Sequence, residues 1–213
     1  VGGVIVDGGT FDYGASGRFP NFTEPDPSYH GLAFWPALGD GSFIIKARVQ
    51  LLRDLGSAIS PQNAFYFLQG LETLSLRMER HFSNAQGVAE FLESHPQVEG
   101  VQYAGLESSP WHDRLQSLGN GQGYGSVPAF VIKGGAEAGS KFIDALELHS
   151  HVANIGDVRS LAIHPASTTH SQLSESEQLD AGVSAGLIRL SVGLETLDDI
   201  VEDLEKGFAA SEK

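Results

Sequence analysis

The chain has 213 residues, of which 27 are acidic and 13 are basic, and it contains no cysteine. The acidic excess repels nucleic-acid phosphates and anionic lipid, so we expect small-molecule partners and neither nucleic acid nor a membrane surface. The missing cysteine excludes disulfides, thiolate metal sites and a cysteine nucleophile, and it is compatible with a cytoplasmic protein. No apolar run approaches the length of a membrane span.

The sequence pattern changes twice within the first 94 residues. Val1–Gly9 is apolar and glycine-rich, with neither an initiator methionine nor a basic signal-peptide start. It predicts a core strand entered midway, and therefore a missing upstream segment. Thr10–Gly41 is dense in Gly, Pro and aromatic residues without a regular period, which predicts an extended, interfacial segment pinned by its side chains. Helical spacing then predicts one helix over Ser42–Ile59 and a second, bent or broken, over Gln62–Ser94.

From Gly100 onward, short β and α pieces alternate, which predicts a compact α/β domain. The expected strands are Val101–Tyr103, Ala129–Lys133 and Leu187–Val192. The expected helices are Ser140–His149, a short helix opened by a capping box at Ser174 and Glu177, and a last helix from Leu197. Thr196 is the expected cap of that last helix, with Asp198 and Asp199 at the positive end of its dipole. The glycines at 119, 121, 123 and 125 precede a strand and predict a flexible turn, not a phosphate cradle.

Arg189 is the strongest candidate for a ligand-binding residue. It lies between Ile188 and Leu190 in an apolar strand, where a guanidinium needs an anion. The planar fork of arginine suits a bidentate clamp on a ligand carboxylate. An internal ion pair with Asp or Glu is the alternative, and the residues by themselves favour that alternative.

Two polar loops are further candidates. Asn154–Asp157 and His164–His170 gather small polar side chains between periodic regions, as a binding loop does. A turn whose side chains satisfy their own backbone is equally compatible with them. The histidine pairs 164/170 and 149/151 lack the spacing of metal ligands, so we expect solvated or capping histidines and no metal.

Several blocks together resemble the Cys/Met-metabolism pyridoxal-phosphate (PLP) enzymes, and within them the O-acetylhomoserine sulfhydrylases, over essentially the whole chain. The blocks are Gly3–Gly9, Phe19-Pro20, Pro25-Asp26, Tyr29–Gly31, Phe43–Arg48, Gln69–Leu74, Asn154–Asp157, His164–His170 and Ile188–Gly193. The resemblance implies the C-terminal part of a PLP-dependent transferase of fold type I, which is aspartate-aminotransferase-like. Residues 1–70 would end the large PLP-binding domain, including its last strand, and residues 71–213 would form the small α/β domain.

The resemblance also assigns site residues. In the family an arginine at the position of Arg189 holds the substrate α-carboxylate, which reverses the preference for an internal ion pair. The residue at the position of Asn154 hydrogen-bonds the same group, and a threonine matching Thr169 lies near the same pocket. Asp157 and His164 are left as loop structure.

The Schiff-base lysine and the main PLP contacts of the family lie upstream of the position of Val1. Lys46 and Lys133 match other positions, so this chain is expected to hold no catalytic residue and to be inert by itself. The expected partners are the N-terminal half of the same enzyme and further copies in a homotetramer.

The implied activity of the complete enzyme is a γ-replacement. O-acetyl-L-homoserine loses acetate and takes up sulfide, giving homocysteine for methionine biosynthesis. An O-succinylhomoserine sulfhydrylase or a methionine γ-lyase is the nearest rival, and asparagine at position 154, where many lyases have serine, disfavours both. A non-catalytic fragment or interaction module is the rival of another class.

Overall fold

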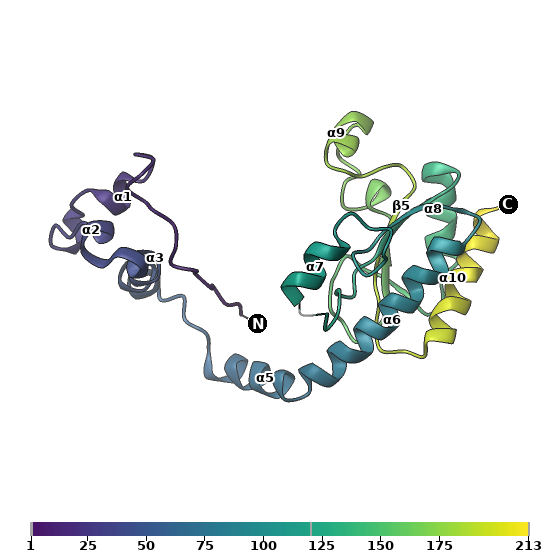
Figure 1. Ribbon diagram of the computed structural model, residues 1–213, viewed down its shortest axis with the longest axis horizontal. Helices are drawn as coiled ribbons and strands as arrows, with labels where there is room; N and C mark the ends of the chain where they lie inside the picture. The colour runs from purple at the N-terminus through teal and green to yellow at the C-terminus, as the bar shows by residue number, and fades with distance from the viewer. Residues whose placement is uncertain (1, 120, 213) are drawn as a thin grey trace. The chain divides into compact units, whose positions relative to one another are not determined.

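The computed structural model describes residues 2–119 and 121–212. The chain divides into two compact units, Val1–Glu72 and Thr73–Lys213 (Figure 1). The assignment of these units to a large and a small domain stays a prediction. No helix in the described ranges combines the length and the apolar character needed to span a bilayer.

The first unit is built from short helical pieces and one longer helix. They are α1 (Pro20–Thr23), η1 (Pro27–Tyr29), α2 (Phe34–Leu38), η2 (Gly39–Gly41), α3 (Ser42–Lys46), η3 (Ala47–Leu52), α4 (Arg53–Leu55) and α5 (Pro61–Glu72). The segment predicted to be extended therefore contains helical turns. Aromatic contacts pin it as predicted: the Tyr13 ring stacks on Phe22 with centroids 4.1 Å apart and meets Trp35 edge-on at 5.7 Å.

The predicted core strand at the N-terminus is wrong for this structure. Residues 2–9 form no strand, and Val4, Ile5 and Val6 are 84%, 70% and 86% exposed. The segment is apolar, but a strand also requires a neighbouring strand with which to form a hydrogen-bond ladder. No described segment lies beside these residues as a ladder partner.

The helical run that begins at Ser42 ends earlier than predicted. Its segments α3, η3 and α4 continue with helical dihedrals to Leu55, and η3 has π-helical hydrogen bonding. Gly56 adopts φ +68° and donates its N–H to the Leu52 carbonyl at 2.8 Å. This left-handed glycine terminates the helix before Ile59, because glycine takes that conformation without steric cost.

The second unit is a mixed sheet with helices packed on it. Its helices are α6 (Leu74–Ser94), α7 (His112–Gly119), α8 (Gly135–Asp144), η4 (Pro165–Ser167), α9 (Glu175–Asp180) and α10 (Leu197–Ser211). Its strands are β1 (Val98–Gln102), β2 (Ala129–Ile132), β3 (Ser150–His151), β4 (Leu161–Ile163) and β5 (Leu187–Ser191). The strand order is β1-β2-β5-β4-β3, antiparallel throughout except for the parallel pair β3 and β4.

The core of this unit lies between the sheet and the helices α6, α8 and α10 (Figure 1). Phe130 of β2, Phe142 of α8 and Phe208 of α10 form its centre, with ring centroids 4.9 to 5.8 Å apart. Ile188 and Leu190 of β5 are fully buried in the same cluster. The packing confirms the predicted α/β domain, with β5 as its middle strand.

Most predicted elements of this unit are present with shifted ends. The break near the middle of the long helical stretch falls at Thr73, and the capping box at Ser174 and Glu177 is formed. The helix predicted at Ser140–His149 is α8, which begins at Gly135 and ends at Asp144. Thr196 is a correction: it occupies the N-cap position of α10, but its side chain makes no capping hydrogen bond.

Candidate functional site

The candidate site is built on β5, the middle strand of the sheet. In the register, Arg189 lies between Ala129 of β2 and Ile163 of β4. Because side chains alternate along a strand, Arg189 and Ser191 point to the face opposite the helices, while Ile188 and Leu190 point into the core. The apolar neighbours thus anchor the strand, and Arg189 is half-buried on the other face.

Arg189 has no acidic partner in the described ranges. No carboxylate of residues 2–119 or 121–212 lies within 4 Å of its guanidinium. Its one hydrogen bond there runs from Nη2 to the Asn154 carbonyl oxygen at 3.4 Å, which is long for such a bond. The internal ion pair suggested by the residues alone is therefore absent from the described part of the chain, and the cation retains donors for an external anion.

The loop containing Asn154 lies against β5. Arg189 contacts its backbone at Asn154, and the Gly156 N–H donates to Ser191 Oγ at 3.1 Å. The Asn154 side chain is exposed, and its Oδ1 accepts the N–H of Ile155 at 2.9 Å. Its amide nitrogen has no partner among the described residues, so Asn154 has donors to offer a ligand beside Arg189.

Thr169 follows η4 and is exposed. Its hydroxyl lies 2.9 Å from Nδ1 of His170, and no described polar contact joins it to Arg189 or Asn154. Its place in a substrate pocket stays a prediction. Asp157 accepts the Arg159 N–H at 3.0 Å within its own loop, which confirms the expected structural role of that carboxylate.

His164 is a buried structural residue. Its Nε2 lies 2.7 Å from the Ala185 carbonyl and its Nδ1 lies 2.8 Å from the Ser167 hydroxyl. A carbonyl only accepts, so Nε2 carries the hydrogen and Nδ1 accepts from Ser167. Both ring nitrogens are occupied, as expected for loop structure.

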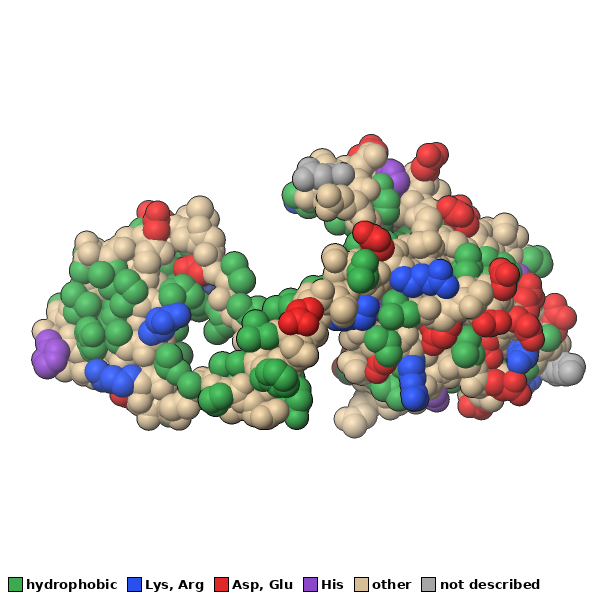
Figure 2. Space-filling view, turned by 90° about the horizontal axis from the view of Figure 1, so that it is seen from below, with side chains coloured by type: hydrophobic (Ala, Val, Ile, Leu, Met, Phe, Trp, Pro, Cys, Tyr) green, Lys and Arg blue, Asp and Glu red, His purple; other side chains and the backbone are tan. Residues whose placement is uncertain are grey.

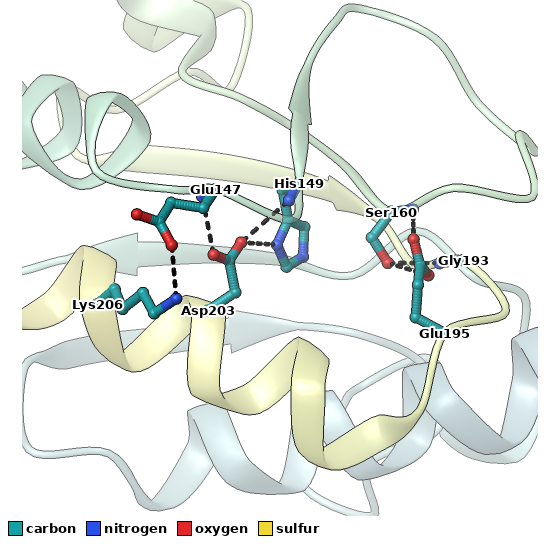
Figure 3. A network of polar contacts seen from close by, with 7 residues as sticks. All are labelled: Glu147, His149, Ser160, Gly193, Glu195, Asp203 and Lys206. Atoms are coloured by element: carbon teal, nitrogen blue, oxygen red, sulfur yellow. Dashed lines mark hydrogen bonds and ion pairs between the residues drawn. The ribbon is translucent and has the colours of Figure 1, made fainter.

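The expectation of a solvated or capping histidine is wrong for His149, which forms a buried pair with Asp203 (Figure 3). The carboxylate of Asp203 on α10 lies 2.8 Å from Nδ1 of His149. It also accepts hydrogen bonds from the backbone N–H groups of Glu147 and His149 at 2.8 and 3.0 Å. Burial raises the pKa of Asp203, but these hydrogen bonds outweigh it and hold that pKa well below its ordinary value. The pair fastens α10 to the chain before β3. No group of three potential metal ligands occurs in the described residues.

A second polar network fixes the end of β5. The Ser160 N–H and hydroxyl donate to the Glu195 carboxylate at 2.7 and 2.9 Å, and Ser160 Oγ accepts the Gly193 N–H at 2.9 Å (Figure 3). From α6, Asn84 donates to the carbonyls of Gly193 and Glu195, and His81 Nδ1 lies 2.6 Å from the Val192 carbonyl. The strand that carries Arg189 is therefore held at its C-terminal end from two sides.

A cavity of about 690 Å³ lies elsewhere in the unit, between α6 and the segment after β1. None of Arg189, Asn154 and Thr169 lines it. Glu90, Glu93 and Glu107 contribute carboxylates to its wall. Because these would repel an anionic carboxylate, the Arg189 face is the better candidate for such a ligand.

The four described lysines are all engaged in the structure. Lys46 pairs with Asp26 at 2.9 Å, Lys141 with Glu137 at 2.7 Å, and Lys206 with Glu147 at 2.7 Å. The ammonium of Lys133 donates to the Pro96 carbonyl at 2.6 Å. Hydrogen bonds from Ser28, Lys46 and Gln50 hold the pKa of Asp26 well below its ordinary value. Each of the four described lysines thus has a polar partner in this structure.

Comparisons with known proteins agree on one family. Residues 1–209 match the family described as Cys/Met metabolism PLP-dependent enzyme. The chain is 56% identical to O-acetyl-L-homoserine sulfhydrylase of Leptospira meyeri, over 98% of this chain and 49% of that protein. It is 54% identical to the sulfhydrylase of the same name from Corynebacterium glutamicum, over 99% of this chain and 48% of that protein.

A solved structure extends the likeness to the fold. A putative O-acetylhomoserine (thiol)-lyase of Campylobacter jejuni, determined with N'-pyridoxyl-lysine-5'-monophosphate, matches with a TM-score of 0.78 and 44% identity. The match covers 91% of this chain and 45% of that one. The chain thus spans about half the length of the relatives it matches.

Proposed function

The chain belongs to the Cys/Met metabolism PLP-dependent enzyme family, and we propose that it is the C-terminal half of a cytoplasmic O-acetyl-L-homoserine sulfhydrylase. The complete enzyme would make L-homocysteine and acetate from O-acetylhomoserine and sulfide. The observation that carries the proposal is Arg189, which lacks a carboxylate partner in the described ranges and lies in a chain more than 50% identical to two sulfhydrylases. The solved relative supports the fold type I architecture.

Arg189 would clamp the α-carboxylate of the amino-acid substrate. Two parallel N–H groups of a guanidinium match the two oxygens of a carboxylate, which fixes the angle of the substrate as well as its position. The strand supports this role because Ile188 and Leu190 are buried and hold the backbone of Arg189 in place. The contribution of Arg189 to catalysis is orientation and not proton transfer.

Asn154 and Thr169 would complete the pocket. The amide nitrogen of Asn154, which has no partner in residues 2–119 and 121–212, is a donor for the same carboxylate, and the contact between its carbonyl and Arg189 keeps the two residues adjacent. Thr169 carries an exposed hydroxyl at the end of the η4 segment, which is a further donor for a polar substrate. We assign it to the pocket with Arg189 and Asn154.

The cofactor would be held mainly outside this chain. PLP supplies an electron sink for reactions at the carbons of an amino acid. The polar partners of Lys46, Lys133, Lys141 and Lys206 in the structure support attachment of PLP to a lysine outside this chain. We therefore assign cofactor attachment to the N-terminal half and substrate orientation to this chain.

The first unit would be covered by partners in the complete enzyme. Helix α5 exposes Phe65, Tyr66, Phe67, Leu68 and Leu71, and Figure 2 shows hydrophobic side chains gathered over this helix. Exposed apolar patches of this kind mark protein interfaces. The N-terminal half and further copies in a homotetramer are the partners we propose.

A donor comparison on the complete enzyme tests the function. O-acetyl-L-homoserine and O-succinyl-L-homoserine are each supplied with sulfide, and homocysteine and the released acid are quantified. We expect homocysteine and acetate in equal amounts, with the acetyl donor preferred. Preference for the succinyl donor, or elimination to an oxo acid in place of homocysteine, would favour the rival enzymes. No turnover with any donor would favour a non-catalytic module.

A further inference from the structure

We propose that Ser191 is a positioning residue, which holds the loop at residues 154–156 so that Asn154 and Arg189 face the same carboxylate. This inference rests on the proposed function of Arg189. Ser191 follows Arg189 by two residues on β5, so both side chains leave the same face of the sheet. Ser191 is buried at 2% exposure, and its Oγ accepts the Gly156 N–H at 3.1 Å.

The loop is fastened to β5 at two points. Arg189 donates to the Asn154 carbonyl at 3.4 Å, and Ser191 accepts from Gly156 two residues further along the loop. The contact at Arg189 is long and therefore weak, whereas the contact at Ser191 has ordinary length. The hydrogen bond to Ser191 is thus the stronger of the two contacts that fix the distance between Asn154 and the strand.

The local backbone makes this anchor specific. Gly156 has φ +79°, a conformation that turns the chain back toward the strand and that favours glycine. A small side chain with an acceptor oxygen is needed opposite the Gly156 N–H, and serine meets both conditions. Alanine at position 191 keeps the strand but leaves that N–H without its acceptor, so the loop loses its fixed distance from Arg189.

A structural role for Ser191 would look different from a positioning role. The backbone of Ser191 pairs with Leu161 of β4, and this pairing does not need the hydroxyl. If the hydroxyl only stabilised the sheet, its removal would lower the melting temperature and act independently of Arg189. If it positions the clamp, its removal matters only while the clamp is intact.

The test compares Ser191→Ala, Arg189→Lys and the double variant in the complete enzyme. Ser184→Ala is the matched control, because the Ser184 hydroxyl is buried without a hydrogen-bond partner among the described residues. Steady-state kinetics give kcat and KM for O-acetylhomoserine and KM for sulfide, and thermal unfolding gives Tm. We expect Ser191→Ala to raise KM for the amino acid roughly tenfold, the loss of about one hydrogen bond, and to leave KM for sulfide unchanged.

The positioning role is tested by comparing the effect of Ser191→Ala on KM in the unaltered enzyme and in Arg189→Lys. In the Arg189→Lys background, Ser191→Ala should add less than about twofold, because the two residues act as one unit. Equal effects in both backgrounds, or an effect no larger than that of Ser184→Ala, would overturn the positioning role and leave the proposed function standing. Unchanged kinetics in Arg189→Lys would overturn the Arg189 clamp and the inference with it, whereas the proposed activity fails only if the donor comparison gives no homocysteine. Should the alanine variant not fold, Ser191→Cys fills the same space with a weaker acceptor and should show the same rise in KM.

Discussion

Replacing Arg189 by lysine separates a substrate clamp from a structural cation. Lysine keeps the positive charge but cannot present two parallel N–H groups to a carboxylate. Losing one charge-assisted hydrogen bond costs about 1.5 to 3 kcal/mol, which is roughly a tenfold to hundredfold loss in kcat/KM for the amino-acid substrate. PLP binding should be nearly unchanged, because we assign Arg189 to the substrate carboxylate and cofactor attachment to the N-terminal half.

The structure also predicts a small effect of the same change on stability. Arg189 makes one long hydrogen bond, at 3.4 Å to the Asn154 carbonyl, and no ion pair in the described ranges. Its loss should cost at most about 0.5 kcal/mol, a shift of roughly 1 to 2 °C in Tm. Arg114→Lys, at an exposed position of α7, is the control. A normal kcat/KM together with a clearly lowered Tm would refute the clamp and establish a structural cation.

Four further outcomes are expected. Asp203→Asn should lower the free energy of unfolding by roughly 3 kcal/mol, because it disrupts a buried pair with His149, while Glu202→Gln on the exposed side of α10 should cost little. The pKa of Asp203 is lower in the folded protein than its ordinary value near ~4, so Asp203 stabilises the fold fully above that pH and loses this contribution as the pH falls below it. The urea midpoint of the unaltered protein should therefore fall in acid, and the midpoint of Asp203→Asn should lack this part of the fall. The chain by itself, treated with PLP and borohydride, should show no preferential label on Lys46 or Lys133 in peptide mass mapping, and a stoichiometric label on either would contradict the assignment of the cofactor lysine to the other half. Light scattering of the complete enzyme should give a tetramer, and a stable monomer at working concentration would contradict the interfacial reading of the first unit.

The elements of the second unit were predictable because their signals are local. Apolar periodicity located β2, β5 and α10, and the capping box at Ser174 marked the start of α9. Their ends were less accurate, as at α8, because helix ends depend on tertiary contacts. The strand predicted at Val1–Gly9 is absent from its described residues for a related reason: an apolar run suits a core, but the ladder partner of a strand lies elsewhere in the sequence.

The residues of the site also differ in whether their signal is local in the sequence. Arg189 was singled out because a guanidinium in an apolar strand needs an anion, but the three local residues favoured an internal ion pair and only the family resemblance favoured a substrate carboxylate. Ser191 was missed, although its place two residues after Arg189 put it on the same face. The pair of His149 and Asp203 joins residues 54 positions apart, and nothing local to either residue announces the other. Hydroxyls and carboxylates have many ways to be satisfied, so their partners emerge only from the fold.

A crystal structure of the complete enzyme with an unreactive amino-acid analogue of the substrate tests the role of Arg189 most directly. We predict that the analogue's carboxylate accepts two hydrogen bonds from the Arg189 guanidinium, with the Asn154 side-chain amide directed at the same group. We also predict that the lysine bonded to PLP lies in the N-terminal half. A carboxylate held elsewhere, with Arg189 turned to an internal acidic side chain, would contradict the proposed clamp.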